Sequence, residues 1–141
     1  MNKKIILSVA AYFVLTMAVA YPWHIMLFHD KYVAMGAFTR GEPIMPFGML
    51  AVILQAIVFA YFYPLFLRHV DGGHPLWRGI QYGLLMGIMV WTVIVFATVA
   101  KFRIEPVTDF VFLATVFQVI QFTLVGGAVG LIYGKLQLNS R

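Results

Sequence analysis

The chain has 141 residues, of which 62% are hydrophobic and only 11% are charged. A soluble domain of this length cannot bury so much apolar surface, so the composition excludes an ordinary soluble protein and indicates an integral membrane protein. The net charge of +5 comes from basic residues that stand singly beside apolar stretches. This pattern favours anionic lipid headgroups of the bilayer as partners and argues against nucleic acid. The sequence has no cysteine, which excludes disulfide bonds and thiolate metal sites.

Four apolar stretches, joined by short polar connections, are each longer than the ~20 residues needed to cross a hydrocarbon core. They predict an all-α, integral membrane four-helix bundle that forms a single transmembrane domain over residues 1–141. We expect the helices at about residues 5–28, 46–67, 76–100 and 109–133. The first connection is the longest, and residues 32–38 within it are a candidate interfacial turn or short helix.

The first apolar stretch has two interpretations. Lys3 and Lys4 precede it, and the Ala-Val-Ala sequence at residues 18–20 is typical of a signal-peptide cleavage site. The apolar run continues to Phe28, which is long for a signal peptide and favours a retained first helix. Pro22 lies inside this helix and has no amide hydrogen for the carbonyl four residues earlier, so we expect a kink there.

The basic residues near the span ends indicate an orientation. With the N-terminus in the cytoplasm, the inner side holds six of them, namely Lys3, Lys4, Arg68, Arg78, Lys135 and Arg141. The outer side then holds four, namely Lys31, Arg40, Lys101 and Arg103. We therefore expect a protein of the bacterial inner membrane with both termini in the cytoplasm.

Residues 42–61 are similar to the stretch 63 residues further on, and upstream of residue 42 the weaker similarity has an offset of 70 residues. At the offset of 63 residues, Gln55 falls on Gln118, and the Glu-Pro pair at residue 42 falls on the Glu-Pro pair at residue 105. The alternative is that Glu-Pro only marks the starts of two helices. We predict a parallel repeat of two helical hairpins, related by a pseudo-twofold axis along the membrane normal. The two hairpins would be residues 1–70 and residues 71–141.

Glycines recur at every fourth residue in two of the spans, which places them on one helix face where another backbone can approach. The two glycine rows are Gly79, Gly83 and Gly87 in the third span, and Gly126, Gly130 and Gly134 in the fourth. Both rows fall in the same leaflet when the two spans are antiparallel neighbours. The pattern predicts a glycine zipper that packs these two spans together. The alternative is that one row faces another protomer or a larger partner.

Three glutamines lie within the predicted spans, namely Gln55, Gln118 and Gln121. A glutamine in hydrocarbon needs a hydrogen-bond partner, so the plainest interpretation is a hydrogen bond between helices. The alternative is a polar site near the pseudo-twofold axis, built around Gln55 and Gln118, where a small solute binds.

A candidate outer-face site lies near the end of the first span and consists of His24, His29 and Asp30. The two histidines are five residues apart, which does not align them on a straight helix. Because no recognised spacing of metal or haem ligands is present, we predict neither a metal site nor a catalytic residue, and no cofactor is assigned. Hydrogen bonding at the membrane interface is the favoured role of these residues.

The number of spans, the Tyr-Pro-Trp-His end of the first span and the Glu-Pro starts resemble small bacterial four-span membrane proteins. This resemblance implies neither an activity nor a functional residue. Because smooth helix surface is abundant and ionisable groups are lacking inside the spans, we favour a non-enzymatic bundle that acts as an accessory, scaffolding or self-associating subunit. It would work as a homo-oligomer or within a larger membrane complex. The alternatives are a small-solute transporter or channel using Gln55 and Gln118, and a membrane enzyme using His24, His29 and Asp30.

Overall fold

The computed structural model describes residues 3–40, 42–70 and 72–138, with side chains as far as residue 134. Within this part of the chain, four helical segments are long and apolar enough to cross a membrane, namely Lys3–Leu27, Met45–Leu67, Pro75–Lys101 and Val107–Gly134. The predicted all-α membrane bundle is therefore confirmed. Of the basic residues counted for orientation, Arg141 and the side chain of Lys135 lie outside the described part.

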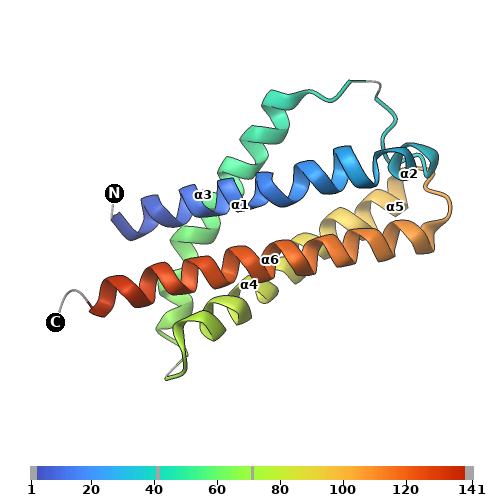
Figure 1. The fold of residues 1–141 in the computed structure, drawn as a ribbon. Coiled ribbons are helices and arrows are strands. Elements are labelled where there is room, and N and C mark those ends of the chain that lie inside the picture. Colours follow the sequence, from blue (N-terminus) through green and yellow to red (C-terminus); the bar gives the residue numbers. More distant parts are fainter. Residues whose placement is uncertain (1–2, 41, 71, 139–141) are drawn as a thin grey trace.

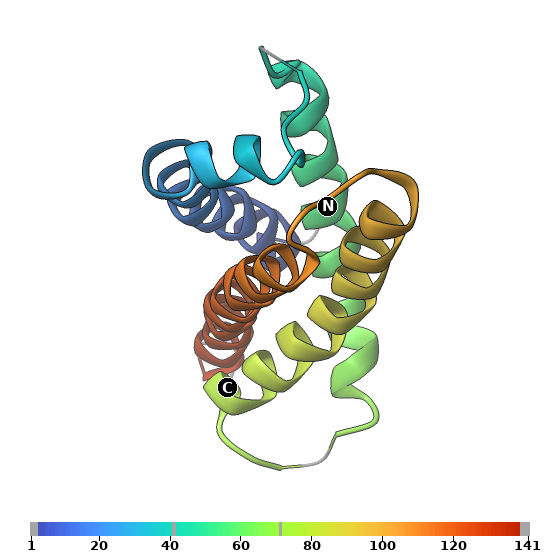
Figure 2. The same cartoon turned by 90° about the vertical axis from the view of Figure 1, so that its right-hand side faces the viewer.

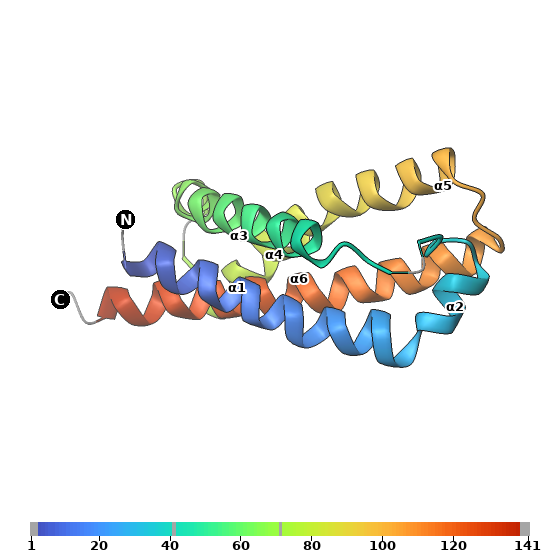
Figure 3. The same ribbon diagram turned by 90° about the horizontal axis from the view of Figure 1, so that it is seen from above.

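The fourth span is the centre of the bundle. Helix α6 (Val107–Leu138) lies between α1 (Lys3–Tyr21) and α4 (Pro75–Trp91), and it is the most buried of the spans. Helix α3 (Met45–Leu67) crosses α1 at a steep angle (Figure 1) and lies to one side of α1 and α6 (Figure 3). Both chain ends lie at the same end of the bundle, which we call the terminal end (Figure 1). The opposite end, which holds the connections 28–44 and 102–106, is the loop end.

The first and third spans each contain a π-helical segment. Helix α1 continues into η1 (Pro22–Leu27), and α4 continues into η2 (Thr92–Phe96) and then α5 (Ala97–Lys101). Because proline has no amide hydrogen, the bonding shifts to partners five residues apart, as in the 3.1 Å bond from the Phe28 amide to the Trp23 carbonyl. The structure therefore has a wider helical turn where the sequence predicts a kink. No proline accompanies η2, and no sequence signal predicts it.

The two glycine rows face each other where α4 packs against α6. A Cβ atom added to Gly79 would lie 2.8 Å from the Cα of Gly130, and one added to Gly83 would lie 3.0 Å from the Cα of Gly126. Real side chains do not approach backbone atoms so closely, so the two helices can be this near only because both rows lack side chains.

The same register extends beyond the glycine pairs in both directions. Gly87 faces the ring of Phe122, whose Cγ would lie 2.9 Å from an added Cβ. Gly134 faces Pro75, whose Cβ would lie 2.6 Å away. Each step of four residues along α4 is thus matched by a step of four back along α6, and one continuous seam joins the two helices.

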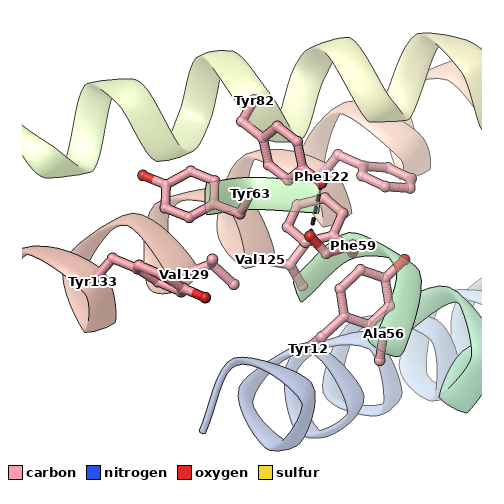
Figure 4. Packing of buried hydrophobic residues seen from close by; sticks show 9 residues of the cluster. All are labelled: Tyr12, Ala56, Phe59, Tyr63, Tyr82, Phe122, Val125, Val129 and Tyr133. Carbon is pink, nitrogen blue, oxygen red and sulfur yellow. Dashed lines mark hydrogen bonds between the residues drawn. The ribbon is translucent and has the colours of Figure 1, made fainter. Parts of the chain in front are cut away.

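Helix α3 joins the bundle mainly through its second half, which is built into an aromatic core near the terminal end (Figure 4). The ring of Tyr82 lies 4.6 Å from that of Phe59 and 5.1 Å from that of Tyr63, and its hydroxyl donates a 2.7 Å hydrogen bond to the Phe59 carbonyl. The buried residues of this core are Tyr12, Ala56, Phe59, Tyr63, Tyr82, Phe122, Val125, Val129 and Tyr133.

The helix bounds differ from the predicted ones mainly at the ends of the connections. Residues His29–Ala34 form the short helix α2 in the first connection, where the sequence suggests a turn or short helix slightly later. Helix α6 begins at Val107 and continues to Leu138, five residues beyond the predicted end. The two hairpins are not equivalent in packing, since α6 is central and α3 peripheral, so the internal repeat stays a prediction.

Candidate functional site

The three membrane glutamines have different surroundings. The hydroxyl of Tyr12 donates a 3.2 Å hydrogen bond to Oε1 of Gln55, which links α1 to α3. The Nε2 atom of Gln121 donates a 3.2 Å hydrogen bond to Oγ1 of Thr16, which links α1 to α6. The structure thus gives these two glutamines the interhelical bonds that the sequence favours. The Oε1 atom of Gln118 is buried and has no hydrogen-bond partner among the described residues.

Gln55 and Gln118 line different cavities in the described part of the chain. Gln55 lines an apolar cavity of about 230 Å³ between α1, α3 and α4, whereas Gln118 lines two other cavities beside α6. The ring of Phe122 lies at the edge of the Gln55 cavity and of one Gln118 cavity. The polar site expected around both glutamines is therefore divided, and only Gln118 retains an unpaired polar atom.

A second predicted residue meets Gln118 at the loop end. His24 and Gln118 both line a cavity of about 250 Å³, which we call the loop-end cavity. It is enclosed by η1, the first connection, the second half of the third span and α6. The lining residues are His24, Tyr32, Ala37, Phe38, Ile94, Thr98, Phe110, Ala114, Phe117 and Gln118.

Aromatic rings surround the imidazole of His24. The ring of Phe117 lies 4.5 Å away and that of Tyr32 lies 5.0 Å away, measured between ring centroids. Phe38 stacks on Tyr32 at 5.1 Å with an angle of 22° between the planes. Contacts between rings at these distances are favourable, so these side chains form one aromatic cluster at the cavity.

The position of His24 follows from the helix that carries it. Ser8, Tyr12 and Thr16 are four residues apart and form the buried row of α1. In an α-helix such a row drifts around the axis, because each turn takes 3.6 residues. The wider turn of η1 reduces this drift, so His24 continues the row and lies beside Phe117 of α6.

Tyr32 closes the cavity from the side of α2. Its ring is buried, and the Nε1 atom of Trp23 donates a 3.2 Å hydrogen bond to its hydroxyl oxygen. Burial raises the pKa of Tyr32, while the hydrogen bond from Trp23 acts in the opposite direction. The phenol therefore stays neutral at physiological pH. The sequence indicates Tyr32 as a hydrogen-bonding partner for the outer histidines, but no pattern marks Phe38, which lies in the connection between two spans.

Two buried polar atoms at this cavity have no partner. Nδ1 of His24 and Oε1 of Gln118 are shielded from solvent and make no hydrogen bond to the described residues. A buried polar atom without a partner costs about 1–3 kcal/mol, so such atoms are normally satisfied by protein, water or ligand. Both residues also line the loop-end cavity.

The other members of the predicted outer-face site lie elsewhere. His29 and Asp30 are exposed in α2, with Nδ1 of His29 3.4 Å from Oδ1 of Asp30. His29 and Arg40 line another cavity of about 240 Å³, which shares Ala37 and Phe38 with the loop-end cavity. His24 thus faces the helix interface while His29 and Asp30 face outward. In the described part of the chain, no group of three or more His, Cys, Asp and Glu side chains is arranged to hold a metal ion.

The loop-end half of α3, Met45–Leu54, packs against little of the chain (Figure 2). Every residue from Glu42 to Ala51 is exposed, including Phe47 at 70%. A Cβ atom added to Gly48 would find nothing within 4 Å. Every other glycine within a described helix would meet neighbouring atoms at that distance.

Comparison with known proteins gives no relative. No protein-family model, no curated protein and no solved structure matches the chain.

Proposed function

We propose that this protein is a non-enzymatic subunit of a membrane assembly, which associates with further copies of itself through the loop-end half of α3. Gly48 is the observation that carries the proposal. A glycine inside a helix costs about 1 kcal/mol relative to alanine, and none of the described residues makes use of the missing side chain of Gly48. A second helix packing at this point would use it, since small residues let membrane helices approach closely.

The residues next to Gly48 also suit the face of α3 that carries it to helix association. Ala51 lies three residues further on and is exposed, so the two residues form a smooth patch on one side of α3. Apolar side chains alone do not bring helices together in lipid, because the lipid tails are equally apolar. A smooth patch allows close van der Waals contact, which does bring membrane helices together. The other residues in the loop-end half of α3 are mostly exposed and can take part in this contact.

We infer further that the protein lies in a bacterial inner membrane with its termini in the cytoplasm. Among the described side chains, four basic ones lie at each end of the bundle, so the orientation rests on the six-to-four count over the whole sequence and on Lys3 and Lys4 beside the first span. A fluorescent protein fused to the C-terminus is expected to be bright, as it folds in the cytoplasm. An alkaline phosphatase fusion at the same point that is active instead would overturn this orientation.

Self-association is tested by cross-linking single cysteines, because the chain has no cysteine of its own. Gly48→Cys in native membranes is expected to yield a disulfide-linked dimer on mild oxidation. Phe112→Cys is the matched control, since Phe112 is 67% exposed and lies near the same end of the bundle on α6. It is expected to stay monomeric, and Gly48→Leu is expected to lower the oligomer mass measured in gentle detergent.

Two results would count against the proposal. A lone monomer in native mass spectrometry, with no cross-link from Gly48→Cys, would contradict any subunit role for this face. A cross-link of equal yield from Phe112→Cys would show random collision in the membrane. A different protein that co-purifies in fixed ratio, and that is lost in Gly48→Leu, would replace self-association by an accessory role.

A further inference from the structure

We propose that the loop-end cavity binds the headgroup of an uncharged, lipid-soluble ring compound with carbonyl groups, the chemistry of a quinone. This inference does not depend on association through α3, which contributes no residue to the cavity. It rests on the two unpaired polar atoms, on the aromatic rings around them, and on an apolar cavity next to them.

The charge of the cavity limits the ligand. None of its ten described lining residues is Asp, Glu, Lys or Arg. A charged group placed here would lose its hydration without gaining a counter-charge, which is costly. The ligand is therefore neutral, and its polar groups must match an imidazole and an amide.

The hydrogen-bonding groups point to carbonyl oxygens on the ligand. A neutral imidazole carries one N–H, which can be on Nδ1 of His24, the atom that has no partner. Rotation of the last side-chain bond of Gln118 exchanges its oxygen with its NH₂ group, so the amide can also donate. Two donors on different helices, η1 and α6, suit a ring with two acceptor oxygens.

The shape of the cavity suits a ring. Phe117 and Tyr32 flank the imidazole, and Phe38 stacks on Tyr32, so a planar headgroup meets aromatic surface on several sides. A volume of about 250 Å³ is below the usual range for ligand pockets, roughly 300–1,000 Å³. It holds a headgroup but not a long apolar tail.

A tail has its own place beside the headgroup. Gln118 also lines a cavity of about 330 Å³ between α4 and α6, whose other lining residues include Leu84, Ile88 and Trp91. This second cavity is apolar, and it lies next to the loop-end cavity because both share Gln118. The side chain of Gln118 borders both cavities, so a ring compound with an apolar chain would fill both once that side chain turns aside, which favours a lipid-soluble ligand over a small polar solute.

The test is a fluorescence titration of the intact protein in detergent with decylubiquinone, which quenches nearby tryptophans. Trp91 lines the second cavity, and Trp23 donates to Tyr32 of the loop-end cavity, so saturable quenching is expected. Gln118→Leu is expected to weaken binding about tenfold by removing one hydrogen bond. Gln55→Leu is the matched control, because it removes a membrane glutamine from a different cavity, and it is expected to leave binding unchanged.

A second variant, which fills the loop-end cavity, tests the proposal without removing a polar side chain. Ala114 lines the loop-end cavity, and Ala114→Phe adds a ring there without removing a hydrogen-bonding group. It is expected to weaken binding at least tenfold, and it decides the matter if Gln118→Leu does not fold by circular dichroism. Quenching that never saturates would overturn the proposal, as would equal affinity in all variants or an equal loss in Gln55→Leu. A cavity filled only by water would give the first of these results.

Discussion

Replacing Gly83 with leucine is expected to lower the free energy of unfolding by about 3 kcal/mol, at the upper end of what overpacking costs. A Cβ atom at this position would lie 3.0 Å from the Cα of Gly126. The obstacle is backbone, so no change of rotamer makes room for the side chain. Helices α4 and α6 must move apart, and every pair along their seam from Gly79 to Gly87 then loses contact. Unfolding in mixed detergent micelles, followed by tryptophan fluorescence, measures the loss.

Gly48→Leu is the matched control for this variant. Both substitutions remove a helical glycine and gain up to about 1 kcal/mol of helix propensity, so this term is common to the two. Only Gly83 has a neighbour, since an added Cβ at Gly48 meets nothing within 4 Å. A monomer carrying Gly48→Leu should therefore be as stable as the parent chain or slightly more stable. Equal stability of the two variants would contradict the packing role of the seam.

The sequence was sufficient for the spans and for the meeting of the two glycine rows. Long apolar runs identify membrane helices because hydrocarbon requires every backbone group to be paired within the helix. Glycines four residues apart lie on one helix face, so the sequence predicts that the two rows pack together, but it does not pair individual glycines. The register, which places Gly87 against Phe122, needed the structure, because it depends on how far the connection lets one helix slide past the other.

The path of α3 could not be predicted from its residues. Apolar side chains occupy every face of this helix, so no stripe marks the side that turns inward. Only Gln55 is polar between Pro46 and Ala60, and it points to one contact, with Tyr12, near the middle of the helix. The departure of the loop-end half from the bundle has no sequence signal at all.

The loop-end cavity was missed for a different reason. The sequence predicts His24 and Gln118 as members of two separate candidate sites, His24 with His29 and Gln118 with Gln55. Their meeting depends on the wide turn of η1, which rotates His24 toward α6, and on the change of direction at Phe28 that carries His29 outward. A proline indicates that the helix changes at this point, but not by which angle.

Phe122→Ala is expected to cost about 2 kcal/mol of the free energy of unfolding. In a soluble protein a buried Phe→Ala change costs about 3–5 kcal/mol, because the ring returns to water on unfolding and a cavity remains in the folded state. In a membrane the ring of the separated helix stays in hydrocarbon, so the transfer part largely cancels and the lost dispersion contacts remain. Phe122 is 1% exposed and lies against Gly87 and near the rings of Phe59 and Tyr12.

The matched control is Phe112→Ala, ten residues earlier on the same helix, where the ring is 67% exposed. Loss of this ring removes lipid contacts in the folded and the separated states alike, so the expected change is within about 0.5 kcal/mol. Phe122 also borders both the 230 Å³ and the 330 Å³ cavities, so its removal joins them into a larger void. If lipid chains filled that void without cost, Phe122→Ala and Phe112→Ala would be equally stable, and the aromatic core would not hold α3 to the bundle.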